Sequence, residues 1–103
     1  MPRTPIHPGE ILADELEEMG LSAKTLAETI GVPPNRLYQI VAGKRTVSAD
    51  TALRLAQHFG MSAEFWMNLQ SAYELDVARQ RSGKALSRIP RRATTAARPR
   101  SAA

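Results

Sequence analysis

The 103-residue sequence has no cysteine, few aromatic residues and no long apolar run. Without cysteine, the chain can form neither a disulfide framework nor a thiolate metal site. Aromatic residues are only 5% of the sequence, so any core must consist mainly of aliphatic side chains. No apolar run approaches the length of a membrane span, and none follows the N-terminus as in a signal peptide. We therefore expect a soluble, cytoplasmic protein of one domain, with no cofactor and no membrane partner.

Charge is distributed unevenly along the chain. Residues 83–103 contain six basic residues and no acidic residue, whereas residues 1–82 have a formal charge of −2. The body is therefore close to neutral, and its total charge does not by itself indicate nucleic-acid binding. Residues 83–103 also contain almost no large apolar side chain, which predicts a disordered tail. Such a tail could be a linker, a nonspecific DNA arm or a segment that folds on a partner.

Apolar residues in the body recur at helical spacing, and no segment alternates as a strand does. Serine or proline residues stand where helices would begin, and glycines stand where most of them would end. The pattern predicts five helices, which begin near Pro8, Ser22, Pro33, Ser48 and Ser62. The last of them should run from about residue 62 to 81. The sequence thus predicts an all-α, five-helix domain over residues 1–82, followed by the basic tail.

Residues 22–43 match the geometric demands of a helix-turn-helix motif. Two short helices can cross closely only where a small residue separates them, and Ala27 stands at that point. Four residues later the backbone must turn left-handed, which glycine does at least cost, and Gly31 stands there. The inner face around this turn is apolar, as the motif requires: Leu26, Ile30, Val32, Leu37 and Ile40. A generic helical hairpin is the alternative to this phage-repressor-like fold.

The second helix of the motif would present polar side chains to DNA. Asn and Gln can pair with adenine edges and Arg with guanine, so the candidate base-reading residues are Asn35, Arg36 and Gln39. Other polar residues flank this helix or lie at the start of the preceding one, where DNA phosphates would pass. The candidate backbone contacts are Ser22, Lys24, Tyr38, Lys44, Arg45 and Thr46. The alternative is that these are ordinary solvated surface residues.

The fifth predicted helix has more apolar surface than one core-facing stripe requires. Phe65, Leu69 and Ala72 form one row, and Trp66, Leu69, Tyr73 and Val77 form a neighbouring row. A helix that is apolar over a wide arc must be buried on more than one side. The second row is therefore a candidate dimer interface. A dimer would place two recognition helices about 34 Å apart, on successive turns of an inverted repeat. Alternatively, both rows belong to the core of one chain.

Several separate motifs give the chain a family resemblance over roughly residues 6–80. They are HPGEIL at 7–12, GKR at 43–45, DTALRLA at 50–56 and FWMNLQ at 65–70. In these motifs the chain resembles the HigA-type, or VapI-like, antitoxins. The resemblance implies a repressor-like helix-turn-helix fold and an antitoxin of a type II toxin–antitoxin operon. It also implies a dimer that binds an inverted repeat in its own promoter, and a ribonuclease toxin of the HigB type as partner.

Other functions remain as alternatives. The chain could be a stand-alone phage-repressor-like regulator without a toxin, or a protein-binding adaptor that no longer contacts DNA. An enzyme is not expected, because the acidic residues of the first helix have no accompanying nucleophile or pocket signature. A metal site is not expected either, because His7 and His58 are far apart and lack ligand-spaced neighbours. Asp50 and Arg54 are spaced to form a surface ion pair.

Overall fold

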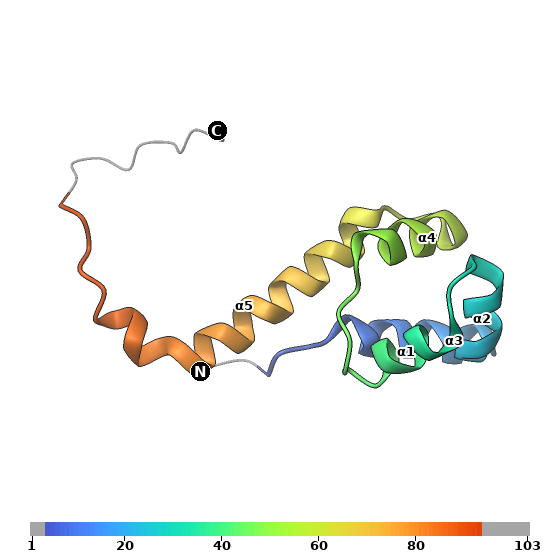
Figure 1. The fold of residues 1–103 in the computed structure, drawn as a ribbon, viewed down its shortest axis with the longest axis horizontal. Coiled ribbons are helices and arrows are strands. Elements are labelled where there is room, and N and C mark those ends of the chain that lie inside the picture. The colour runs from blue at the N-terminus through green and yellow to red at the C-terminus, as the bar shows by residue number, and fades with distance from the viewer. Residues whose placement is uncertain (1–3, 94–103) are drawn as a thin grey trace.

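The computed structural model describes residues 4–93, and five α-helices account for most of them. They are α1 (Pro8–Met19), α2 (Ala23–Ile30), α3 (Pro34–Val41), α4 (Ala49–Phe59) and α5 (Ala63–Ser87) (Figure 1). No β-strand occurs within residues 4–93. The predicted all-α, five-helix fold is confirmed, and all five helices begin within one residue of the expected positions. Within the same range, no helix combines the length and the hydropathy that a membrane span requires.

Local capping explains where the helices start. Ser22, Ser48 and Ser62 each accept a hydrogen bond at Oγ from the backbone N–H three residues later, at 3.0, 3.3 and 3.2 Å. Each bond satisfies a donor that has no partner inside the helix. The start of α1 is different, because its cap is His7: the imidazole Nδ1 accepts from the Gly9 N–H at 2.9 Å. Three of the predicted starts thus rest on serine caps.

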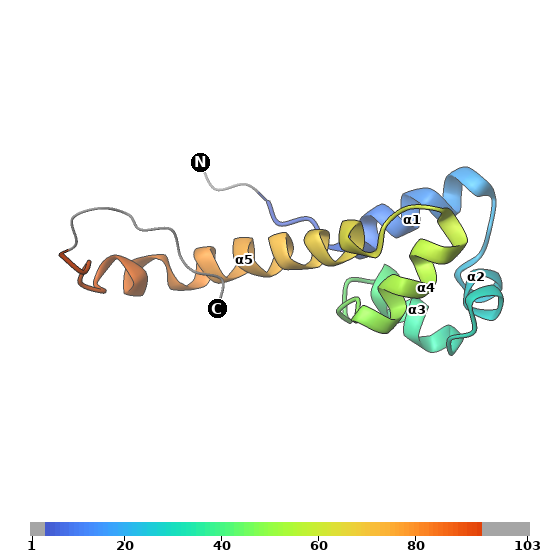
Figure 2. The same ribbon diagram turned by 90° about the horizontal axis from the view of Figure 1, so that it is seen from above.

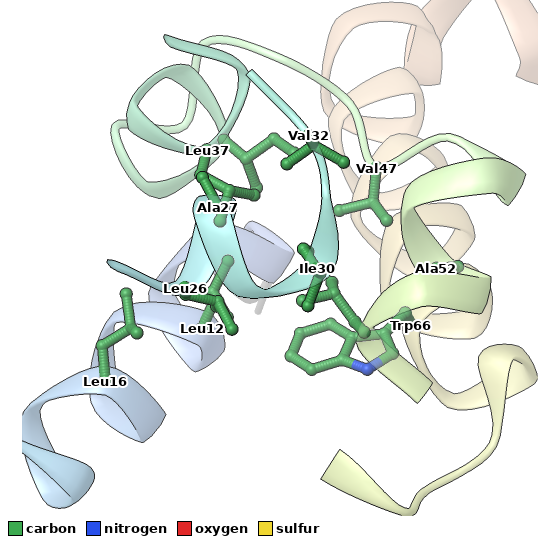
Figure 3. Packing of buried hydrophobic residues seen from close by; sticks show 12 residues of the cluster. Leu12, Leu16, Leu26, Ala27, Ile30, Val32, Leu37, Val47, Ala52 and Trp66 are labelled. Carbon is green, nitrogen blue, oxygen red and sulfur yellow. The ribbon is translucent and has the colours of Figure 1, made fainter. Parts of the chain in front are cut away.

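The core lies between α1, α2, α3, α4 and the first half of α5. The buried apolar side chains are Leu12, Leu16, Leu26, Ala27, Ile30, Val32, Leu37, Ile40, Val47, Ala52, Leu55 and Trp66 (Figure 3). Most are aliphatic, as the composition requires. Trp66 is 0% exposed, so its predicted place in a dimer interface is wrong. A side chain with no exposed surface in one chain has none left to bury against a second chain.

The fifth helix is longer than the sequence predicts. It ends at Ser87, six residues beyond Arg81, so the prediction of disorder is wrong for residues 83–87. A helix that is already nucleated extends residue by residue without needing apolar side chains, and composition alone does not reveal this. In both ribbon views, the distal part of α5 extends away from the other helices (Figures 1 and 2). The predicted disorder of 94–103 falls outside the described residues.

Candidate nucleic-acid interface

The crossing of α2 and α3 has the geometry of a helix-turn-helix. Ala27 is 0% exposed, and its carbonyl accepts from the N–H groups of both Gly31 and Val32, at 2.9 and 3.0 Å. Gly31 has a φ of +79°, in the left-handed region that glycine adopts most easily. A Cβ at this position would also lie 3.0 Å from the Arg54 guanidinium. The turn therefore depends on both the alanine and the glycine that the sequence singles out.

Arg54 fastens α4 to this turn. Its Nη1 donates to the Ile30 carbonyl at 2.9 Å, at the C-terminal end of α2 where carbonyls have no partner inside the helix. Its Nε donates to Asp50 Oδ2 at 3.0 Å, which confirms the predicted pair. The bond to Ile30 was not predicted, because the two residues lie 24 positions apart and no local pattern joins them. Arg54 therefore ties α4 to the end of α2, directly before the turn into α3.

The outer face of α3 presents the three candidate base-reading residues at different depths. Asn35 is exposed, whereas Arg36 and Gln39 are half-buried. On the opposite face, Leu37 and Ile40 are 0% exposed, so α3 cannot rotate to hide its polar side. Arg36 Nη1 lies 3.5 Å from Asp50 Oδ2. A partly exposed pair at this distance is worth less than about 1 kcal/mol, so it leaves the guanidinium free to take another partner.

The candidate backbone contacts fall into two groups. Arg45 and Thr46 line a surface hollow with Arg36, together with the start of α4. The adjoining Lys44 is exposed. At the start of α2, the Ser22 hydroxyl already caps the helix. These positions place basic and hydroxyl side chains beside the candidate base-reading helix.

Among the candidate phosphate contacts, Lys24 already forms an ion pair within the protein. Its Nζ lies 2.8 Å from Glu28 Oε2, and both side chains are well exposed. The hydrogen bond to Glu28 raises the pKa of Lys24, and Tyr38 on α3 is close enough to contribute electrostatically in the same direction. A phosphate would have to compete with Glu28 for this lysine.

Two residues that support this surface were missed. His7 was considered only as a metal ligand and as part of a family motif, yet it caps α1 and packs beside Gly43 at the start of the loop that leads to α4. Gln70 appeared only within a family motif, yet its Oε1 accepts from the Val47 N–H at 2.8 Å. Both are almost fully buried. A polar residue within an otherwise apolar helical pattern is the one sequence signal that could have found Gln70.

The rest of the predicted dimer row lies on the surface of α5. Leu69 is partly buried and packs against the core. Tyr73 and Val77 are half-buried, and the Tyr73 ring meets the His7 ring edge-on with centroids 4.9 Å apart. These three residues keep some free surface, unlike Trp66. Within residues 4–93, no three His, Cys, Asp or Glu side chains are grouped as a metal site requires.

The geometry is that of a helix-turn-helix protein, and the comparisons agree. A family model described as "Helix-turn-helix" matches residues 12–66, more than half of the chain. Virulence-associated protein I of Dichelobacter nodosus is 53% identical over 76 residues, which cover 73% of this chain and 70% of that protein.

Two solved structures show to which family of helix-turn-helix proteins the chain is similar. An addiction module antidote protein of the HigA family from Coxiella burnetii is similar with a TM-score of 0.85 and 47% identity, covering 88% of this chain and 100% of that one. Pseudomonas aeruginosa antitoxin HigA, in a structure with the higBA promoter, is similar with a TM-score of 0.82 and 45% identity, covering 85% and 97%. The chain belongs to the HigA family of helix-turn-helix antitoxins.

Proposed function

We propose that this chain is an antitoxin that binds an inverted repeat in its own promoter as a dimer. It represses its operon in the cytoplasm and neutralises a ribonuclease toxin of the HigB type. The observation that carries the DNA-binding part is the outer face of α3, where Asn35, Arg36 and Gln39 stand next to the exposed residues 44–46. The P. aeruginosa relative, in a structure with its higBA promoter, supports the same mode of binding.

Within this proposal, α3 enters the major groove. Asn35, Arg36 and Gln39 contact base edges there, and specificity follows from their donor and acceptor patterns. Lys44, Arg45 and Thr46 contact one DNA strand's phosphates, while Ser22, Lys24 and Tyr38 contact phosphates on the other side of α3. Phosphate contacts fix the register of the helix without reading sequence. Dimerisation through Leu69, Tyr73 and Val77 would double both sets of contacts.

The base-reading role is tested with Arg36→Ala and Gln39→Ala on a duplex of the native promoter. Each change should weaken specific binding by about 1–3 kcal/mol and leave binding to an unrelated duplex nearly unchanged. Gln57→Ala is the matched control, because Gln57 is an exposed glutamine near the end of α4. Unchanged specificity in folded Arg36→Ala and Gln39→Ala proteins would remove both residues from the base-reading set.

The phosphate role is tested by the salt dependence of the same affinity. Lys44→Ala should weaken binding to all sequences alike and lower the salt slope by about one, since one fewer counterion is released. The toxin part is tested separately, by mixing the protein with the product of the neighbouring reading frame and measuring both complex formation and ribonuclease activity. DNA binding without any toxin complex would favour the stand-alone regulator.

A further inference from the structure

The loop between α3 and α4, residues 43–47, carries exposed side chains on a backbone that is held from inside the protein. Lys44, Arg45 and Thr46 are exposed, whereas Val47 is only 2% exposed and belongs to the core. The loop begins under the control of α3, because the Lys44 N–H donates to the Gln39 carbonyl at 2.8 Å. It ends at Ser48, the cap of α4. The middle of the loop has no regular secondary structure of its own to hold it.

We propose that Gln70 and His7 are positioning residues for DNA binding. They hold the backbone of loop 43–47 so that Lys44 and Arg45 remain directed towards the DNA phosphates. This inference rests on the proposed function, from which it takes the phosphate contacts of these two residues. It adds that the first half of α5 and the start of α1, which carry none of the candidate DNA contacts, set the strength of the phosphate contacts.

Gln70 supplies the stronger of the two restraints. Its side chain is 5% exposed and reaches from α5 to the loop, where Oε1 accepts from the Val47 N–H at 2.8 Å. Its Nε2 donates to Glu74 Oε2 at 2.9 Å, so both ends of the amide are satisfied. An apolar side chain of similar size could fill the same space. The amide therefore serves the buried backbone N–H of the loop, which would otherwise lack a partner.

His7 supplies the second restraint from the opposite end of the chain. Its Nδ1 accepts from the Gly9 N–H at 2.9 Å, so the cap of α1 fixes where the ring lies. The imidazole also lies beside Gly43, whose added Cβ would be 3.9 Å from His7 Cγ. On its far side the ring contacts Tyr73 of α5. His7 thus packs between α5 and the loop.

The two restraints act at opposite ends of the loop. His7 packs beside Gly43, and Gln70 accepts the N–H of Val47. Lys44, Arg45 and Thr46 lie between these two points, and all three are exposed. If either restraint is lost, Lys44 and Arg45 must be ordered by the DNA itself, and the cost of that ordering reduces their contribution to affinity.

The test combines Gln70→Met with the paired substitution Lys44→Ala, Arg45→Ala in a thermodynamic cycle on the native promoter duplex. Methionine keeps the approximate size of glutamine but cannot accept the Val47 N–H. We expect Gln70→Met to weaken binding by up to about tenfold at 0.1 M salt, roughly the contribution of one released counterion, and to lower the salt slope. In the Lys44→Ala, Arg45→Ala background, Gln70→Met should weaken binding little further, because the phosphate contacts through which Gln70 acts have been removed. Gln57→Met is the matched control.

A purely structural role for Gln70 would lower thermal stability and leave the salt slope unchanged, which would overturn the proposal. Additive effects in the cycle would also overturn it. If Lys44→Ala and Arg45→Ala themselves leave the slope unchanged, the proposed phosphate contacts fail instead. Should Gln70→Met not fold, His7→Asn tests the same point. Asparagine can still cap α1 but cannot fill the space of the imidazole ring between Tyr73 and Gly43. A folded His7→Asn protein with the wild-type slope would contradict the proposal.

Discussion

The two halves of α5 have opposite surroundings although they form one continuous helix. In the first half, Trp66 and Gln70 are buried, and Leu69 and Tyr73 are half-buried against the rest of the chain. Beyond Val77, every described residue except Ser82 is exposed, and Leu86 is exposed by 49%. Figures 1 and 2 show this distal half without a neighbouring helix. Helix formation and burial are therefore separate properties within a single element.

The comparison shows how one helix can serve two purposes. The first half completes the core of the helix-turn-helix domain and, through Gln70, reaches the loop that follows α3. The distal half contributes nothing to that core and is rich in basic residues, namely Arg79, Arg81 and Lys84. Most helices in proteins are stabilised by tertiary packing. The distal half of α5 has no such packing within the described part of this chain, so its helical structure must be stabilised by interactions within the helix. Changes in the two halves should therefore differ sharply in effect.

The largest expected effect is that of Trp66→Ala. Trp66 fills the core with no exposed surface, so its truncation should cost about 3–5 kcal/mol of unfolding free energy. Leu86→Ala in the distal half should cost less than about 0.5 kcal/mol. Urea unfolding followed by circular dichroism checks both. A large loss in Leu86→Ala that grows with dilution would instead place the distal half in an interface between two copies.

Gly9→Ala should have the next largest effect, because Gly9 is the point where α1 meets the end of α3. A Cβ built there would lie 1.8 Å from the Ile40 carbonyl oxygen, so one helix would have to move. We expect a loss of about 1–3 kcal/mol in stability, as for other overpacked sites. Promoter affinity should also fall, since Ile40 belongs to the recognition helix. Wild-type stability and affinity in this variant would mean that α1 and α3 separate freely.

The motifs and helix starts could be predicted because they depend on neighbours in sequence. Serine caps, the Ala27–Gly31 pair and the spacing of apolar residues each act within one or two turns of helix. The face of α5 that packs against the core could not be predicted in the same way. Its wide apolar arc predicts burial on two faces, but periodicity does not say which face meets the core. The row containing Trp66 was therefore assigned to a dimer, whereas the structure places Trp66 in the core.

The supporting residues of the candidate site were missed for a related reason. Arg54 reaches Ile30 and Gln70 reaches Val47 across 24 and 23 positions of the chain. Such bonds exist only once the helices have packed, so no local pattern encodes them. The candidate DNA contacts were easier to predict, because they need only an exposed position on a helix or loop. The sequence thus predicts which residues form the candidate DNA-binding surface, and the structure adds the long-range hydrogen bonds that support it.

The pH dependence of stability tests how strongly the burial of His7 against the first half of α5 disfavours its protonation. Burial lowers the pKa of His7 below its ordinary value, although the Arg45 backbone bond and the Glu10 carboxylate oppose this, and Tyr73 is its neighbour on α5. Between the two pKa values the folded chain binds fewer protons than the unfolded chain. Stability from this group is therefore complete above about pH 6.5 and declines as the pH falls below it.

The decline from one proton cannot exceed about 1.4 kcal/mol per pH unit. Thermal unfolding of wild type and His7→Asn between pH 5 and 8 isolates the contribution, because asparagine keeps the cap without titrating in this range. The wild-type curve should fall more steeply below pH 6.5 than the variant curve. Parallel curves would show that His7 titrates alike in the folded and unfolded chains.

The smallest expected effect is that of Gly83→Ala, which tests whether the distal half of α5 unfolds together with the first half. Gly83 lies within α5, and a Cβ there would meet nothing within 4 Å. Replacing glycine by alanine in an exposed helix stabilises it locally by about 0.5–1 kcal/mol. If the distal half frays independently of the core, this gain should raise the helical signal in circular dichroism but leave the main unfolding midpoint unchanged. A raised midpoint would instead show that the two halves of α5 unfold together, so that the distal half is coupled to the domain despite its exposure.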